Sequence, residues 1–140
     1  MQHDFFGELI YSSRKNFTGN DYFYAKMPFS LSTEVIELFI DAAPSGPTAS
    51  QVEFYKEIEK NYASISQSII PIIEDEFRNW QEDFKIEDFS VEFQPTFIHL
   101  PRMESKPIVW EISFDSIHDK NHCFSITMND FSAISVLIDG

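Results

Sequence analysis

An apolar stripe in the middle of the chain constrains the fold more than any other feature. Between residues 52 and 84, large apolar side chains recur at steps of three and four: Val52, Tyr55, Ile58, Tyr62, Ile65, Ile69, Ile72 or Ile73, Phe77, Trp80 and Phe84. This spacing places them on one face of a helix, which at about 1.5 Å per residue would approach roughly 50 Å. Pro71 lies inside this segment and removes the hydrogen bond to the Gln67 carbonyl. We therefore expect a kink or a break between residues 67 and 71.

Strand patterns lie on both sides of this helix. Seven segments are rich in aromatic and aliphatic residues and are predicted as strands: Phe5–Ser12, Asp21–Phe29, Thr33–Ile40, Phe89–Leu100, Ile108–Phe114, Cys123–Met128 and Ala133–Ile138. The first two are expected to form a hairpin across the polar residues 13–20. The loop 115–122 is expected to join antiparallel neighbours, because no helix-length crossover separates the strands on its two sides.

A proline- and glycine-containing segment, residues 43–50, separates the first strands from the helix. Within it, Thr48 and Ser50 are both suitable residues to cap the helix that follows. Strands, one long helix and strands again predict a single α+β domain over residues 1–140. We expect an antiparallel sheet of about six to seven strands, packed on one long central helix that is kinked or broken near Pro71.

The charge balance limits the choice of partner. The chain has 23 Asp and Glu residues against 10 Lys and Arg residues, so its formal net charge is −13. Such a surface repels nucleic acid and anionic membranes and attracts a cationic protein. With 43% hydrophobic residues and 15 Phe, the chain is too apolar to be a disordered acidic tail. We therefore expect a folded protein with a basic protein partner, and neither nucleic acid nor membrane as a partner.

Three further observations favour the cytoplasm. Cys123 is the single cysteine, so no internal disulfide can form, as is usual in a reducing compartment. The first residues, Met1–Phe6, lack the basic and apolar regions of a signal peptide. The longest apolar runs are short and interrupted, and none approaches the roughly 18 to 20 residues that cross a bilayer.

Acidic residues concentrate between Glu74 and Glu92. Eight acids against Arg78 and Lys85 give a local charge of −6 (eight minus two) over these nineteen residues. One interpretation is a solvated face, and the other is a docking surface for a basic partner, in which one exposed aromatic residue among Trp80, Phe84 and Phe89 would act as an anchor. The predicted partner-binding residues are Glu74, Asp75, Glu76, Glu82, Asp83, Glu87 and Asp88.

A second cluster, Asp115, His118, Asp119, His122 and Cys123, contains residue types that bind metals. Two histidines four residues apart point the same way only on a helix, however, and this stretch is predicted as a hairpin loop. The alternative interpretation is a polar loop whose Asp and Asn residues serve the turn. His3 and His99 could join a metal site only through folding.

Motifs for other chemistry are missing from the sequence. The four glycines form neither a P-loop nor a Gly-x-Gly-x-x-Gly motif, and the chain has no Gly-x-Ser-x-Gly nucleophile elbow. Cys123 follows His122 directly, and adjacent residues of a strand point to opposite faces, so we expect an inert, buried thiol. We therefore predict no catalytic residues, no metal ligands and no cofactor.

Several segments share features with a known group of domains. The helical stretch begins near a glutamine, Gln51 in Ser50–Asn61, and it ends with the aromatic residues of Phe77–Trp80. Three strand patterns follow it: Pro95–Leu100, Ile112–Asp115 and Asn121–Ile126. Together they resemble the central helix, the next strand and the last hairpin of an uncharacterised family of small acidic bacterial domains. The resemblance spans about two-thirds of the chain. It implies an α+β fold and no known activity, and it also implies a gene in a toxin–immunity locus, where such domains are often met.

A glycine usually follows the loop histidine in that family, whereas Cys123 follows it here, so a shared role of this loop is not implied. Our preferred hypothesis is a cytoplasmic immunity protein that neutralises a basic bacterial toxin by electrostatic docking and occlusion. A variant is a nucleic-acid mimic that blocks a DNA-binding enzyme. Two other classes remain open: a small metal-dependent enzyme built on His118 and His122, and a structural or oligomerisation module, such as a homodimer joined through a sheet edge.

Overall fold

A seven-stranded, mostly antiparallel sheet forms the body of the protein. The computed structural model describes residues 1–13, 19–32 and 34–139. The strand order is β3-β4-β5-β6-β7-β8-β9, and only β5 and β6 are parallel neighbours. The strands are β3 (Ile10–Ser12), β4 (Tyr22–Pro28), β5 (Val35–Asp41), β6 (Phe93–Leu100), β7 (Val109–Ser116), β8 (Asp119–Asn129) and β9 (Ser132–Asp139). The predicted α+β class is confirmed, and the parallel pair departs from the expected antiparallel pattern because the helical segment acts as a crossover between β5 and β6.

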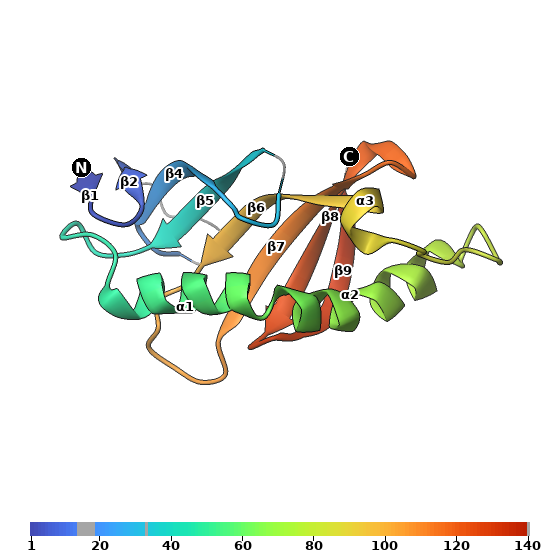
Figure 1. Ribbon diagram of the computed structural model, residues 1–140. Coiled ribbons are helices and arrows are strands. Elements are labelled where there is room, and N and C mark those ends of the chain that lie inside the picture. The colour runs from blue at the N-terminus through green and yellow to red at the C-terminus, as the bar shows by residue number, and fades with distance from the viewer. Residues whose placement is uncertain (14–18, 33, 140) are drawn as a thin grey trace.

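Two helices lie end to end across one face of this sheet, and a third is a single turn (Figure 1). They are α1 (Ala49–Lys60), α2 (Tyr62–Phe77) and α3 (Phe89–Glu92). The prediction of one long central helix is therefore wrong. The first helix ends at Asn61, whose backbone has φ −101° and ψ 15° and whose side-chain amide donates to the Glu57 carbonyl at 2.8 Å. This side-chain hydrogen bond competes with continued helix, as is common for asparagine.

Of the expected kink or break near Pro71, the break is wrong, because Pro71 lies inside α2 and the two helices are separated at Asn61. Pro71 and Gln67 are both exposed, so water can bond the Gln67 carbonyl that lacks an N–H partner. The helix therefore tolerates Pro71 because this residue lies on its solvent-exposed side.

The apolar stripe of the helices packs on the sheet as predicted, up to the end of α2. Its buried members are Tyr55, Ile58, Tyr62, Ile65, Ile69, Ile73 and Phe77. Opposite them, Leu38, Ile98, Ile112 and Ile126 are register neighbours across four adjacent strands and are fully buried. Each such side chain stabilises the fold by roughly 1.5–3 kcal/mol through burial. The core therefore lies between α1–α2 and one face of the sheet.

Thr48 is the cap of α1, and Ser50 is the second residue of the helix. Thr48 Oγ1 accepts the N–H of Gln51 at 3.3 Å, and Gln51 Oε1 accepts the N–H of Thr48 at 3.0 Å. Gln51 Nε2 also donates to the carbonyls of Asp41 at 2.7 Å and Pro101 at 3.0 Å. This capping box therefore ties the start of the helix to the ends of two neighbouring strands.

The predicted strand Phe5–Ser12 is not continuous. Gly7 has φ +76° and turns the chain, and the short strands β1 (Gln2–His3) and β2 (Gly7–Glu8) form a separate two-stranded sheet. Phe5 and Phe6 lie in the turn between them and pack edge-on against Tyr55, with ring centroids 5.8 Å and 6.0 Å away. Their apolar side chains therefore cover the start of α1 instead of extending a strand.

Other predicted boundaries shift by a few residues. Phe89–Glu92 forms α3, so the predicted strand Phe89–Leu100 begins only at Phe93. The predicted loop 115–122 is shorter in the structure, with the turn at Ile117–His118 and antiparallel strands on both sides as expected. The hairpin of β3 and β4 is confirmed. Residues 14–18 of the loop in this hairpin lie outside the described residues. So does Thr33, the first residue of the predicted strand Thr33–Ile40.

Candidate partner-binding surface

The acids predicted to bind a partner lie at the end of α2 and in the segment that follows. We call this segment, residues 78–88, the acidic loop. It projects past the end of α2 at one end of the molecule before the chain returns to α3 (Figure 1). The structure leaves five of the seven predicted acids exposed, Asp75, Glu82, Asp83, Glu87 and Asp88, and a sixth, Glu76, half-buried; the seventh is half-buried as well.

The seventh acid, Glu74, holds the acidic loop in place. Its Oε2 accepts the N–H of Ile86 at 2.9 Å, its Oε1 lies 3.6 Å from Nη2 of Arg78, and its side chain is only 14% exposed. Arg78 in turn donates from Nε to the Phe84 carbonyl at 3.2 Å. These contacts join α2 to both halves of the returning loop, so Glu74 and Arg78 fix the conformation of the acidic loop.

Aromatic stacking fixes the acidic loop on the sheet. The rings of Phe77 and Phe84 stack at 4.2 Å with an interplanar angle of 14°, and Phe77 also stacks on Phe124 of β8 at 5.5 Å. The Phe84 ring meets His118 of the β7–β8 turn edge-on at 4.9 Å. Stacked and edge-on aromatic pairs contribute about 0.5–1.5 kcal/mol beyond their burial. The acidic loop is therefore an ordered part of the fold.

Trp80 is the aromatic residue that stays outside this packing. Its side chain is 58% exposed, whereas Phe84 and Phe89 are buried. The indole lies against Phe77 on one side, with ring centroids 5.2 Å apart. Tryptophan is enriched among the side chains that anchor protein interfaces. The acids that follow Trp80 in the acidic loop, Glu82 and Asp83, are exposed as well.

Cations near Trp80 do little to balance these acids. Arg78 is engaged by Glu74 and by Asp75, whose Oδ1 lies 3.4 Å from Nη1 of Arg78. Lys85 is the remaining cation in the acidic loop. The carboxylates of Glu82, Asp83, Glu87 and Asp88 outnumber these two cations, so the acidic loop carries a net negative charge that attracts cations and speeds their arrival.

Glu92 and His118 close the inner end of the acidic loop. The Glu92 carboxylate is nearly buried and accepts the N–H groups of Glu87 at 2.8 Å and Asp88 at 2.6 Å. Its Oε1 lies 2.5 Å from Nε2 of His118. Burial by itself raises the pKa of Glu92, but the hydrogen bonds from Asp88, His118 and Glu87 outweigh it and lower the pKa below its usual value. Glu92 is therefore a buried charge that joins three segments.

The predicted metal-binding cluster is divided between separate contacts. His118 turns to Glu92, while Nδ1 of His122 lies 2.6 Å from Oδ2 of Asp119 and lowers the pKa of that carboxyl. Cys123 is half-buried, and burial raises the pKa of its thiol. Within residues 1–13, 19–32 and 34–139, no three His, Cys, Asp or Glu side chains are grouped so that they could hold a metal ion. A metal-dependent enzyme built on His118 and His122 stays an alternative hypothesis.

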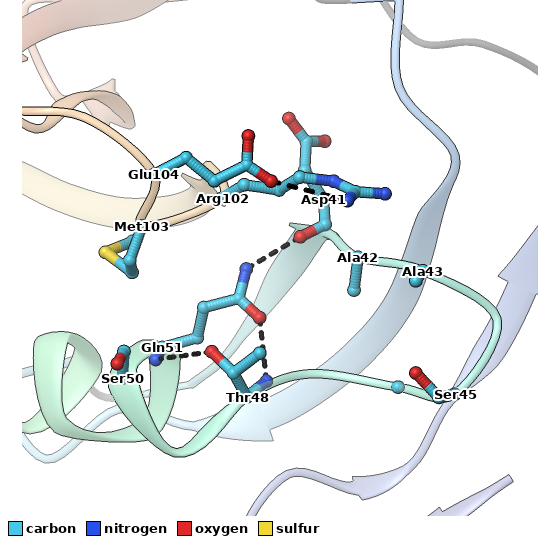
Figure 2. A pocket seen from close by; sticks show the side chains of 11 residues that line it. Asp41, Ala42, Ala43, Ser45, Thr48, Ser50, Gln51, Arg102, Met103 and Glu104 are labelled. Carbon is cyan, nitrogen blue, oxygen red and sulfur yellow. Dashed lines mark hydrogen bonds and ion pairs between the residues drawn. The ribbon is translucent and has the colours of Figure 1, made fainter.

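Sequence reasoning missed a polar site at the start of α1. A pocket of about 240 Å³ lies there between the capping box and the segment after β6 (Figure 2). Arg102 and Glu104 form one side, with Nη1 and Oε1 3.5 Å apart, and Gln51 and Thr48 form another. In Figure 2, Arg102 bonds Glu104, and Gln51 bonds Thr48 and the Asp41 carbonyl, so the groups around the pocket join the helix to the end of a strand.

Behind this pocket, Oδ2 of Asp41 lies 3.1 Å from Nε2 of His99, and both side chains are buried. The sequence signal was a polar residue at the end of each of two apolar strands. Only the parallel pairing of β5 with β6, which the pattern did not predict, brings the two ends together. The pair therefore could not be found from spacing.

Comparisons with protein-family models, with curated proteins and with solved structures found no match. The family resemblance inferred from the sequence therefore stays a prediction. Among the residues that the structure describes, no helix is both long enough and apolar enough to span a membrane.

Proposed function

We propose that this protein is an immunity protein that neutralises a basic bacterial toxin in the cytoplasm. It binds the toxin through Trp80 and the acids around it, and it occludes the cationic active site of the toxin. The observation that carries the proposal is the exposed indole, packed on Phe77 within a loop that carries four exposed carboxylates.

The electrostatic part of the proposal concerns the approach of the partner. A net charge of −13 attracts a basic protein from a distance, and the acidic loop concentrates that attraction at one end of the molecule. Such steering can raise association rates toward 10⁸ M⁻¹s⁻¹ or more at low salt. Carboxylates at the rim of an interface act mainly on this rate and contribute less to the lifetime of the complex.

Trp80 supplies the contact that keeps the partner bound. Tryptophan is enriched among the few residues that dominate binding energy, and its replacement by alanine in such a position costs about 2 kcal/mol or more of binding. Its indole face also suits an arginine of the partner, because guanidinium groups stack on aromatic rings. The toxin–immunity context comes from the family resemblance and from the charge, and the reducing compartment from the lone cysteine.

A co-expression experiment tests the proposal. The probe is a basic toxin domain encoded beside the gene, produced in a bacterial host together with this protein. We expect the wild-type protein to restore growth. The E82Q/D83N/E87Q variant and W80A should restore it weakly or not at all, because they remove the steering charges and the anchor.

The matched control is the D4N/E34Q/E37Q variant. It removes the same number of charges from exposed acids outside the acidic loop, so it should protect as well as the wild type. The proposal would be contradicted if W80A and E82Q/D83N/E87Q both protected the host fully. It would also be contradicted if the control variant lost as much protection as E82Q/D83N/E87Q, because net charge would then be the only cause.

A further inference from the structure

The outer edge of β9 has the properties of a strand-binding site. β9 is the last strand of the sheet, and no other described strand pairs with its outer side. Its eight residues contain no Lys, Arg or Pro and a single charge, Asp139. Proteins usually protect sheet edges with such residues or with very short strands, as at the opposite edge, where β3 has three residues. A long edge with a single charge, at its last residue, therefore needs an explanation.

The first residues of this edge are already covered by α2. Ser68 Oγ accepts the N–H of Ala133 at 2.7 Å, and the register of β8 with β9 shifts at Thr127/Met128, opposite the same place. From residue 135 to residue 139 the pairing with β8 is regular. These last residues are the part of the edge that another strand can reach.

The flank of α2 beside β9 leads directly into the acidic loop. Ser68, Ile72 and Glu76 follow at steps of four residues, so they lie on the flank that Ser68 places against β9. The chain continues to coil after the helix, because the N–H groups of Asn79 and Trp80 donate to the carbonyls of Glu76 and Phe77. Trp80 therefore follows directly on the end of this flank, four residues after Glu76.

The side chains of β9 that face the helices are only half covered. Val136 and Ile138 pair with Ile126 and Phe124, which are fully buried, yet both remain partly exposed. A further strand along β9 would place every second side chain beside them and under the flank of α2. It would also cover apolar surface and satisfy the backbone groups of the edge.

We propose that an extended segment of the basic partner adds to β9 as an eighth strand of the sheet, with Glu76 and Trp80 above it and Asp139 at its end. This inference rests on the proposed function, which supplies the basic partner. Charge selects this occupant, since a lysine or arginine of the added strand would meet acids on the flank. A second copy of the chain would bring a charge of −13 against the same surface.

The experiment uses a soluble peptide of alternating lysine and valine as the probe. The control peptide has the same side chains but carries N-methyl groups on alternate residues, so it keeps its charge and cannot pair with an edge. Binding is measured by titration, and backbone amide exchange of residues 135–139 is followed by NMR. We expect the unmodified peptide to slow amide exchange at these residues. The methylated peptide should bind at least about tenfold more weakly than the unmodified one, since several ladder hydrogen bonds are lost.

Two protein variants sharpen the result. L137K places a positive charge, like those of the peptide, at an exposed residue of the edge and should weaken binding of the unmodified peptide. V109K adds the same charge at an exposed residue of β7 and should leave that binding unchanged. Equal binding of both peptides, with unchanged exchange at residues 135–139, would overturn strand addition. If that binding were also lost in E82Q/D83N/E87Q, the proposed electrostatic function would stand alone.

Two further outcomes decide the matter. If neither peptide binds at low salt, strand addition and electrostatic capture are both overturned. If residues 135–139 are protected without peptide, and this protection rises with protein concentration, the edge belongs to a second copy and the proposal is overturned.

Discussion

Oε1 of Glu92 lies 2.5 Å from Nε2 of His118, and this contact connects α3 to the turn between β7 and β8. The same carboxylate accepts the N–H groups of Glu87 and Asp88, where the acidic loop ends. One buried charge therefore fixes the base of the surface that carries Trp80. The position of the exposed acids of the acidic loop therefore depends on the buried carboxylate of Glu92.

The first prediction concerns the stability that Glu92 provides. E92Q keeps the shape of the side chain and loses its charge, so we expect the free energy of unfolding to fall by about 1–3 kcal/mol at neutral pH. The pKa of Glu92 is lowered in the fold, so its contribution is complete above the ordinary glutamate pKa of about 4.3 and disappears as pH falls through the lower folded pKa. Urea unfolding from pH 7 to pH 3 should show the two curves converging below about pH 4.

E87Q is the control for this prediction, because Glu87 is exposed and contributes only its backbone N–H to the contact. Its unfolding curve should match the wild type throughout. A constant difference between wild type and E92Q at every pH would show that the charge of Glu92 is not what stabilises the joint.

The second prediction separates the two capping candidates of α1. T48A removes the oxygen that accepts the Gln51 N–H and should cost about 1 kcal/mol, whereas S50A should change stability by less than about 0.5 kcal/mol. Q51A should cost more than T48A, since it also leaves the carbonyls of Asp41 and Pro101 without their donor. Thermal unfolding of the three variants tests this order, and an effect of S50A as large as that of T48A would refute the assignment of the cap.

The third prediction contrasts two aromatic residues of the acidic loop. F84A removes a buried ring stacked on Phe77 and should destabilise the protein by about 3–5 kcal/mol. W80A removes an exposed ring and should cost less than about 1 kcal/mol, since one face still contacts Phe77. Denaturant titration measures both. A large loss of stability in W80A would mean that Trp80 serves the fold and is not kept for binding.

The fourth prediction concerns the thiol of Cys123. Burial raises its pKa, and the carboxylates of Asp115 and Asp139 add to the effect, against the hydrogen bonds of Ser125 and Ser113. Alkylation by iodoacetamide should therefore be slower at pH 8 than for an unperturbed cysteine of pKa about 8.5, and should rise at higher pH. D139N should shift the rate profile to lower pH. Mass spectrometry gives the rates, and a profile equal to that of free cysteine in both proteins would be inconsistent with this account.

Periodicity predicted what depends on local pattern. The stripe from Tyr55 to Phe77 is buried as expected, and the strands after the helix follow their alternation. The predicted stripe continued to Trp80 and Phe84, yet the helix ends at Phe77. The chain then turns back, so that the ring of Phe84 stacks on that of Phe77. Spacing alone cannot distinguish a helical step from a return of the chain, so the exposure of Trp80 required the tertiary fold.

Local chemistry decided the features that the pattern did not predict. Asn61 ends α1 through a side-chain hydrogen bond, whereas the more familiar helix breaker, Pro71, is tolerated because it faces water. The acids differ in the same way. Glu74 and Glu92 are chemically like Glu82, but contacts from distant segments turn the first two into structural groups. Those contacts are long-range, and sequence composition does not encode them.

The most direct test of the central claim is the association rate of the basic toxin domain with this protein, measured by stopped flow at about 50 mM and about 200 mM salt. We predict that the wild type and D4N/E34Q/E37Q associate rapidly at low salt and slow steeply at high salt. E82Q/D83N/E87Q should associate about tenfold more slowly at low salt, with a weaker dependence on salt. Identical rates and salt dependence for the two triple variants would contradict the claim that the acidic loop around Trp80 receives the partner.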